Sequence, residues 1–178
     1  GLIDLLMDFR DQGMIKFIGV SSALSHLPAL IDLGVFDTFQ IPYSCLVPIH
    51  HEWIAKAAEA GAGIIIRGGI AHGGPESDVA AWVGDKAEMR RAAWAAAREI
   101  AASARNKVQR GEVPSAMKSA ELVLRYTLTH PHCNTTIVGT LNPNHLVENV
   151  AAAEKGPLPA ELYEDVKGRL TKLLVEYQ

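Results

Sequence analysis

The sequence lacks the features that mark disulfide-rich, membrane-spanning or nucleic-acid-binding proteins. It contains only two cysteines, Cys45 and Cys133, too few for a disulfide framework, so we expect two buried thiols in a reducing compartment. No apolar run approaches the roughly 20 residues that span a bilayer, and we see no signal peptide. The net charge of -3 offers no basic patch for nucleic acid. We therefore expect a cytoplasmic protein without membrane or nucleic-acid partners.

The seven histidines do not form a metal-binding motif. His50 and His51 are adjacent, so we expect their rings to diverge, and His130 and His132 flank Pro131 at an expected helix end. The sequence contains no H-E-x-x-H motif and no cluster of cysteine and histidine. It also lacks the G-x-S-x-G motif of serine hydrolases. We expect no metal site, and loop or helix-cap positions for these histidines.

Helix and strand patterns alternate along the chain, which is typical of an α/β fold. Helices are expected over residues 2–10, 27–33, 52–60, 116–129, 143–153 and 158–177, and strands over residues 16–20, 36–41, 63–66 and 136–138. The strands are continuously apolar, which predicts a parallel sheet covered by helices. Residues 77–111 are rich in strong helix formers, so we expect a helical insert after the third strand. The chain is expected to form a single domain, residues 1–178.

Residues 135–149, TTIVGTLNPNHLVEN, predict a short buried strand that turns directly into a helix. Gly139 ends the strand, Asn142 is a good helix N-cap, and Pro143 suits the first helical position. Such a helix start leaves backbone N–H groups free near the carboxyl end of the strand, and these groups favour a bound anion such as phosphate. A purely structural turn would have the same pattern, so both interpretations remain open.

Four stretches together carry a resemblance to a known family: MIKFIGVSS, FDTFQIPYS, GAGIIIRGG and TTIVGTLNPNHLVENV. In this order and near this spacing they are similar to the second half of the aldo-keto reductases. These are NAD(P)H-dependent (β/α)8-barrel enzymes that reduce carbonyl groups. The resemblance covers almost the whole chain and implies half of a (β/α)8 TIM barrel. Four parallel βα units would correspond to barrel strands five to eight, with an extra C-terminal helix, and the first four strands would be absent.

The resemblance also implies where a cofactor would bind. Ser21 and Ser22 match the Ser-Asn pair at the nicotinamide amide, although Ser22 lacks the amide side chain, and Gln40 matches a glutamine that contacts the same group. Glu148 and Asn149 match the pair at the adenine edge. These matches imply a site for NADP, with NAD as a further possibility.

Other positions depart from the family pattern. Thr140 is retained near the adenosine phosphate, but Gly139 and His145 replace the basic pair around the 2′-phosphate. Gly69 stands where the family often has an aromatic residue stacked on the nicotinamide. A neutral imidazole is a poor substitute for a guanidinium group, although Arg67 could supply positive charge nearby. We therefore expect a weak or vestigial cofactor site.

In the family, the catalytic Asp, Tyr, Lys and His all come from the first half of the barrel, and none of those motifs occurs here. Tyr43 has no lysine partner in the sequence, so we expect it to pack and not to act as an acid. Three hypotheses remain open. The chain is a half barrel with a weakened nucleotide site and no reductase activity, a fragment of a complete reductase, or a non-catalytic oligomeric module.

A half barrel has two unpaired sheet edges and an apolar inner face, both of which promote association. We therefore expect a homo-oligomer. In a dimer with its two-fold axis along the barrel, strand eight of one copy would pair with strand five of the other and close eight strands. Two half barrels stacked face to face, or an open sheet covered by the alanine-rich helices, are the alternatives.

Overall fold

The computed structural model describes residues 1–70, 87–109 and 117–175. Its elements are α1 (Leu2–Asp11), β1 (Gly19–Ser21), α2 (Leu27–Asp32), β2 (Thr38–Pro42), the 3-10 helix η1 (Pro48–His50), α3 (His51–Glu59), β3 (Gly63–Arg67), α4 (Ala87–Gln109), α5 (Ser119–Thr129), β4 (Thr135–Thr136), α6 (Pro143–Glu154) and α7 (Ala160–Val175). Helix α4 lies within residues 77–111, where a helical insert was expected. Residues 77–86, 110–111, 116 and 176–177 of the expected elements lie outside the described residues.

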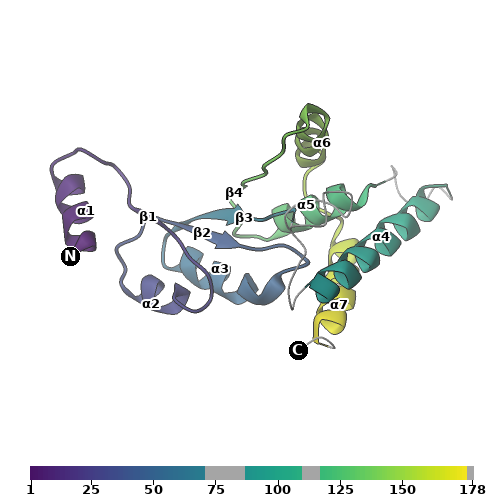
Figure 1. Ribbon diagram of the computed structural model, residues 1–178, viewed down its shortest axis with the longest axis horizontal. Coiled ribbons are helices and arrows are strands. Elements are labelled where there is room, and N and C mark those ends of the chain that lie inside the picture. Colours follow the sequence, from purple (N-terminus) through teal and green to yellow (C-terminus); the bar gives the residue numbers. More distant parts are fainter. Residues whose placement is uncertain (71–86, 110–116, 176–178) are drawn as a thin grey trace.

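The four strands form one parallel sheet in the order β1-β2-β3-β4 (Figure 1). Sequential strands are neighbours, and each is joined to the next through at least one helix. This order confirms four parallel βα units. Because the order is simply sequential, β1 and β4 are the two edges of the sheet.

The sheet buries its two faces unequally. Phe39 and Ile41 of β2 and Ile64 and Ile66 of β3 are at most 2% exposed, and they pack with residues of α2 and α3. The residues between them, such as Gln40, are only half-buried. Helices therefore cover one face of the described sheet, and the other face is the more open one.

Both edge strands differ from the prediction. Lys16 and Phe17 are exposed and precede β1, while the backbone N–H of Ile18 donates to Asp37 Oδ2 (2.7 Å) instead of a strand. At the other edge, Ile137 N still donates to Ile66 O (2.8 Å), but the Ile137 side chain is 50% exposed. The strand is therefore shorter and more exposed than the buried strand predicted over residues 136–138, because no described strand pairs with the free edge of β4.

The helices form two groups (Figure 1). Helices α2 and α3 lie against the sheet, while α4 packs on α5 and α7, and α5 packs on α6. Helix α5 begins at Ser119 and not at residue 116, because Lys118 has an extended backbone with ψ of 155°. Helix α1 places Leu2, Leu5 and Phe9 along one side but buries none of its residues. Helix α1 therefore adds no buried residue to the core.

Candidate functional site

Two of the expected nicotinamide contacts lie together at the carboxyl end of the sheet. Ser21 and Gln40 are register partners on β1 and β2, and Ser21 Oγ donates to Gln40 Oε1 (3.1 Å). Both side chains lie on the sheet face that α2 and α3 leave uncovered. Ser22 does not join them, because its hydroxyl donates to the carbonyl of Ala23 (3.3 Å). The pair can therefore offer a hydroxyl and an amide to a ligand on the open face.

Gly69, just after β3, has little room for a side chain. A Cβ built on Gly69 would collide with Thr136 Oγ1, and the Gly69 carbonyl accepts a hydrogen bond from Thr127 Oγ1 (3.1 Å). A side chain at this position would therefore have to displace the Thr136 side chain. An aromatic platform at this position is therefore excluded by the packing itself.

The start of α6 is capped as the sequence predicts but is not an open anion site. Asn142 Oδ1 accepts from Asn144 N and the Asn142 carbonyl accepts from His145 N, each at 3.0 Å. Pro143 carries no N–H group, and Leu146 N also reaches the Asn142 carbonyl at 3.4 Å. The expectation of free backbone N–H groups at this helix start is therefore wrong, because Asn142 satisfies them.

The residues expected at the adenosine phosphate form an exposed turn. Gly139, Thr140 and His145 are all exposed, and Thr140 Oγ1 lies 3.5 Å from His145 Nδ1. Glu148 is held by Lys118, whose Nζ lies 2.5 Å from Glu148 Oε1, and this hydrogen bond lowers the pKa of the carboxyl group. A ligand that contacts Glu148 must therefore compete with Lys118 or bind beside the ion pair.

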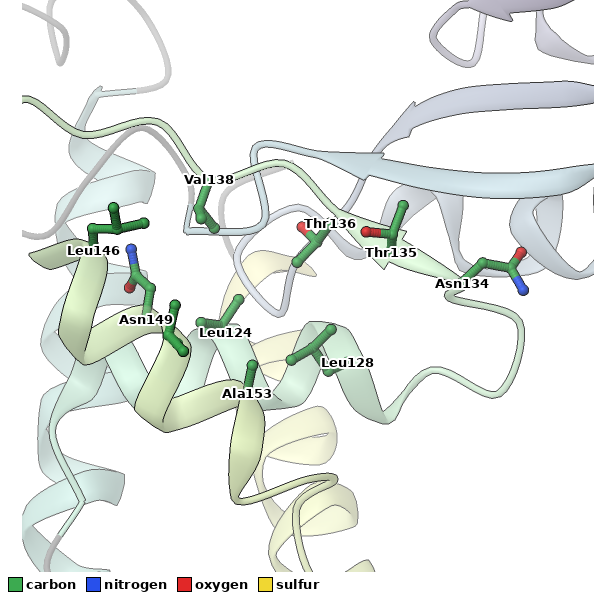
Figure 2. A pocket seen from close by; sticks show the side chains of 10 residues that line it. Leu124, Leu128, Asn134, Thr135, Thr136, Val138, Leu146, Asn149 and Ala153 are labelled. Atoms are coloured by element: carbon green, nitrogen blue, oxygen red, sulfur yellow. The ribbon is translucent and has the colours of Figure 1, made fainter.

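Asn149, the second residue expected at the adenine edge, faces a pocket between β4, α5 and α6 (Figure 2). The pocket has a volume of about 240 Å³ and is largely apolar. Its lining residues are Leu124, Leu128, Asn134, Thr135, Thr136, Val138, Leu146, Asn149, Val150 and Ala153. This pocket was not predicted from the sequence. The spacing of Leu146, Asn149, Val150 and Ala153 on one side of α6 was the available signal.

Histidines from distant parts of the sequence also meet, which the sequence analysis did not foresee. The rings of His51 and His130 lie 4.5 Å apart, and Tyr43 Oη is hydrogen-bonded to His51 Nδ1 (3.0 Å). Within residues 1–70, 87–109 and 117–175, no group of three histidine, cysteine, aspartate or glutamate side chains could hold a metal ion. The cluster is a packed contact between α3 and the end of α5.

Four parallel βα units, with polar side chains gathered at the carboxyl ends of the strands, define half of a parallel α/β barrel. A sequence model of the Aldo/keto reductase family matches residues 2–170, and the chain belongs to this family. No individual curated protein matches significantly. None of the described helices is both long and apolar enough to cross a membrane.

The fold is similar to that of solved family members. The holo form of aldo-keto reductase AKR11C1 from Bacillus halodurans superposes with a TM-score of 0.71 at 23% identity. The match covers 96% of this chain and 54% of the AKR11C1 chain. The apo form gives a TM-score of 0.66 at 22% identity, with 96% and 55% coverage. The chain therefore spans about half the length of these structures.

Proposed function

We propose that this chain carries the nucleotide-holding half of an NAD(P)H-dependent aldo-keto reductase site, in a reducing compartment such as the cytoplasm. The pocket behind Asn149 would take the adenine ring, and the exposed turn of Thr140 and His145 would take the adenosine phosphate. The Ser21–Gln40 pair would hold the nicotinamide amide. The observation that carries this proposal is the apolar pocket, because it opens beside the residues that the family resemblance assigns to adenosine.

The same contacts support weak binding of the nucleotide. The N–H groups at the start of α6 are satisfied by Asn142, and Glu148 is already paired with Lys118. His145 presents a single ring nitrogen where a guanidinium group would make a two-pronged contact with phosphate. Binding of NADP should therefore be weak, and its preference over NAD should be small.

The chain is not expected to reduce carbonyl groups alone. When bound, the dinucleotide would supply a hydride, but a general acid must protonate the carbonyl oxygen. Tyr43 does not fill this role, because it is 1% exposed, its hydroxyl is bonded to His51, and burial raises its pKa. A steady-state assay with NADPH and a reactive aldehyde should show no turnover. If turnover is seen and a substitution in this chain abolishes it, the activity belongs to the chain and this part of the proposal is refuted.

Nucleotide binding is tested by titration calorimetry of the 178-residue chain with 2′,5′-ADP, NADP and NAD. We expect His145→Arg to strengthen binding of 2′,5′-ADP about tenfold, since one charge-assisted hydrogen bond contributes roughly 1.5 kcal/mol or more. Binding of 5′-ADP, which lacks the 2′-phosphate, should not change. His26→Arg, on an exposed residue before α2, is the matched control.

A second variant tests the pocket separately. Ala153→Phe places a ring inside the pocket and should abolish binding of all three nucleotides while the protein stays folded. Unchanged affinity in Ala153→Phe would show that adenine binds elsewhere. The absence of heat with every nucleotide in the unsubstituted chain would favour the alternative of a non-catalytic oligomeric module.

The open edges support a proposal about assembly. Two copies would pair β4 of one with β1 of the other, and this would cover Ile137 at one edge and Phe17 at the other. Helix α6 and the partner's α1 would then meet over the same pair of strands. Because α1 buries no residue, it can move aside with little loss of packing. Sedimentation velocity should show a dimer or higher oligomer, and a stable monomer at micromolar concentration would contradict this.

The coverage of solved relatives supports a different origin for the missing strands. The chain spans 54% of the holo enzyme, so a longer polypeptide could supply the other strands itself. The coding sequence upstream of Gly1 decides this point. An upstream half with the family's catalytic tyrosine and lysine would make the chain part of a complete reductase, whereas its absence would favour the homo-oligomer.

A further inference from the structure

Tyr43 and His51 form a hydrogen-bonded pair inside the protein, beside the carboxyl end of β2. Tyr43 directly follows β2 and is 1% exposed, and its Oη lies 3.0 Å from His51 Nδ1. A buried hydroxyl group needs an acceptor, and His51 Nδ1 is the partner that the described residues offer this one. A neutral imidazole has a lone pair on one ring nitrogen. The Tyr43 hydroxyl therefore donates to His51 Nδ1, and the His51 proton lies on Nε2.

The surroundings of His51 keep its ring neutral but able to take up a proton. Burial is the main cause that lowers its pKa, and the charge of Lys167 lowers the pKa further. Glu52 of α3 and Glu164 of α7 act on the pKa in the opposite direction. His130, at the end of α5, contributes a ring whose centroid lies 4.5 Å from that of His51. His51 is therefore a free base at neutral pH, with two carboxylates that favour its charged form.

A row of three tyrosine rings leads from Tyr43 toward the surface. The ring centroids of Tyr43 and Tyr126 lie 6.1 Å apart, and Tyr126 stacks on Tyr163 of α7 at 4.7 Å. An electron passes readily between aromatic rings at such separations. Tyr163 is 9% exposed, but its hydroxyl is buried without a hydrogen-bond partner in the described residues. A phenol that is hydrogen-bonded to a base is thus found at the inner end of the row, at Tyr43.

We propose that Tyr43 and His51 act as a redox-active pair that gives one electron to a strong one-electron oxidant such as an organic peroxyl radical. Tyr43 loses the electron through Tyr126 and Tyr163, its Oη proton moves to His51 Nδ1, and the peroxyl radical becomes a hydroperoxide anion. The products in the protein are a neutral tyrosyl radical and an imidazolium ion. The proton transfer avoids a phenol cation in the protein interior, where an unpaired charge is costly. An electron from a reductant such as ascorbate restores Tyr43 and draws the proton back.

Flash photolysis of the 178-residue chain tests the pair without any nucleotide, so the outcome is independent of the nucleotide site. The oxidant is trivalent ruthenium tris-bipyridine, generated by light and persulfate. A Tyr177→Phe parent restricts the tyrosines to the three in the row, and deuterated tyrosine identifies their radical by electron paramagnetic resonance. We expect a tyrosyl radical that forms more slowly in heavy water, because the proton moves with the electron. Its formation should also slow as the pH falls through the lowered pKa of His51, because the protonated ring accepts no proton.

Substitutions in the same parent assign the radical to the pair. Tyr43→Phe keeps the ring and removes the phenol, and His51→Gln keeps an acceptor for the hydroxyl but cannot take up the proton. Each should lower the radical yield about tenfold or more, since a positioned base contributes at least this much to a proton transfer. Tyr163→Phe, the matched control, should leave the yield unchanged. The proposal is overturned if Tyr43→Phe or His51→Gln matches the parent. Where circular dichroism shows a variant to be unfolded, the heavy-water effect in the parent decides instead, and its absence overturns the proposal.

Discussion

The packing of His130 predicts how stability depends on pH. His130 is 2% exposed, its Nδ1 accepts from the backbone N–H of His132 (3.2 Å), and its Nε2 donates to the carbonyl of His51 (3.3 Å). Both ring nitrogens are thus used by the neutral form. Protonation would place a second N–H against the His132 N–H, beside the His51 ring.

These surroundings define the size of the effect. Burial, followed by the neighbouring His51, lowers the pKa of His130 from 6.5 to about 4. At about 1.4 kcal/mol per pH unit, the largest possible loss of stability is about 3 kcal/mol. Because the folded pKa lies below the unfolded one, the stabilisation is complete above pH 6.5 and is lost as the pH falls toward 4. At pH 5 we expect about 2 kcal/mol to be lost.

Urea unfolding between pH 5 and 7.5 measures this loss. His130→Asn keeps an acceptor near the His132 N–H but cannot be protonated, so its free energy of unfolding should fall by about 2 kcal/mol less than that of the unsubstituted chain. His26→Gln, at an exposed position, should follow the unsubstituted chain. Parallel pH profiles for His130→Asn and the unsubstituted chain would refute the reasoning, because the titrating group would then lie elsewhere.

Three further substitutions test the packing around the site by urea unfolding. Gly69→Ala should destabilise the fold by about 1–3 kcal/mol because its Cβ meets Thr136, whereas Gly168→Ala, in an open helical position, should be neutral or stabilising. Arg125→Met should lose about 3 kcal/mol with the buried contacts to the carbonyls of residues 156 and 157, and a loss below 1 kcal/mol would contradict that role. Asn142→Ala should lose about 1 kcal/mol with the α6 cap, and no change would mean that the cap is dispensable.

The fold was predictable where local pattern and tertiary neighbours agree. The second and third strands and the capped start of α6 could be placed from β-branched runs and from Asn142 with Pro143. The edge strands could not, because their length depends on neighbours on both sides. Ile137 has the side chain of a buried strand residue, yet it is half exposed since no described strand pairs with β4 on its free edge.

The candidate site was predictable only where it depends on short motifs. Ser21 and Gln40 were found from motifs on two strands, and register pairing brings them together. The contact between His50 and Leu24 joins residues 26 positions apart, and no spacing rule in a single sequence indicates it. The expectation of free N–H groups at the start of α6 was wrong for a related reason. The side chain and carbonyl that make Asn142 a good cap also occupy those groups.

The residues that stabilise the fold lie on the covered face of the sheet, whereas Gln40, an expected ligand contact, lies on the open face. Phe39, Ile41, Ile64 and Ile66 form the core on the covered face, and Gln40 lies between two of them with its side chain on the other face. Substitutions on the open face therefore remove little buried apolar area. Such residues can change without unfolding the protein. Gln40→Ala should accordingly leave the free energy of unfolding within about 0.5 kcal/mol of the unsubstituted value while weakening the binding of NADP. Loss of both together would show that the open face is part of the core.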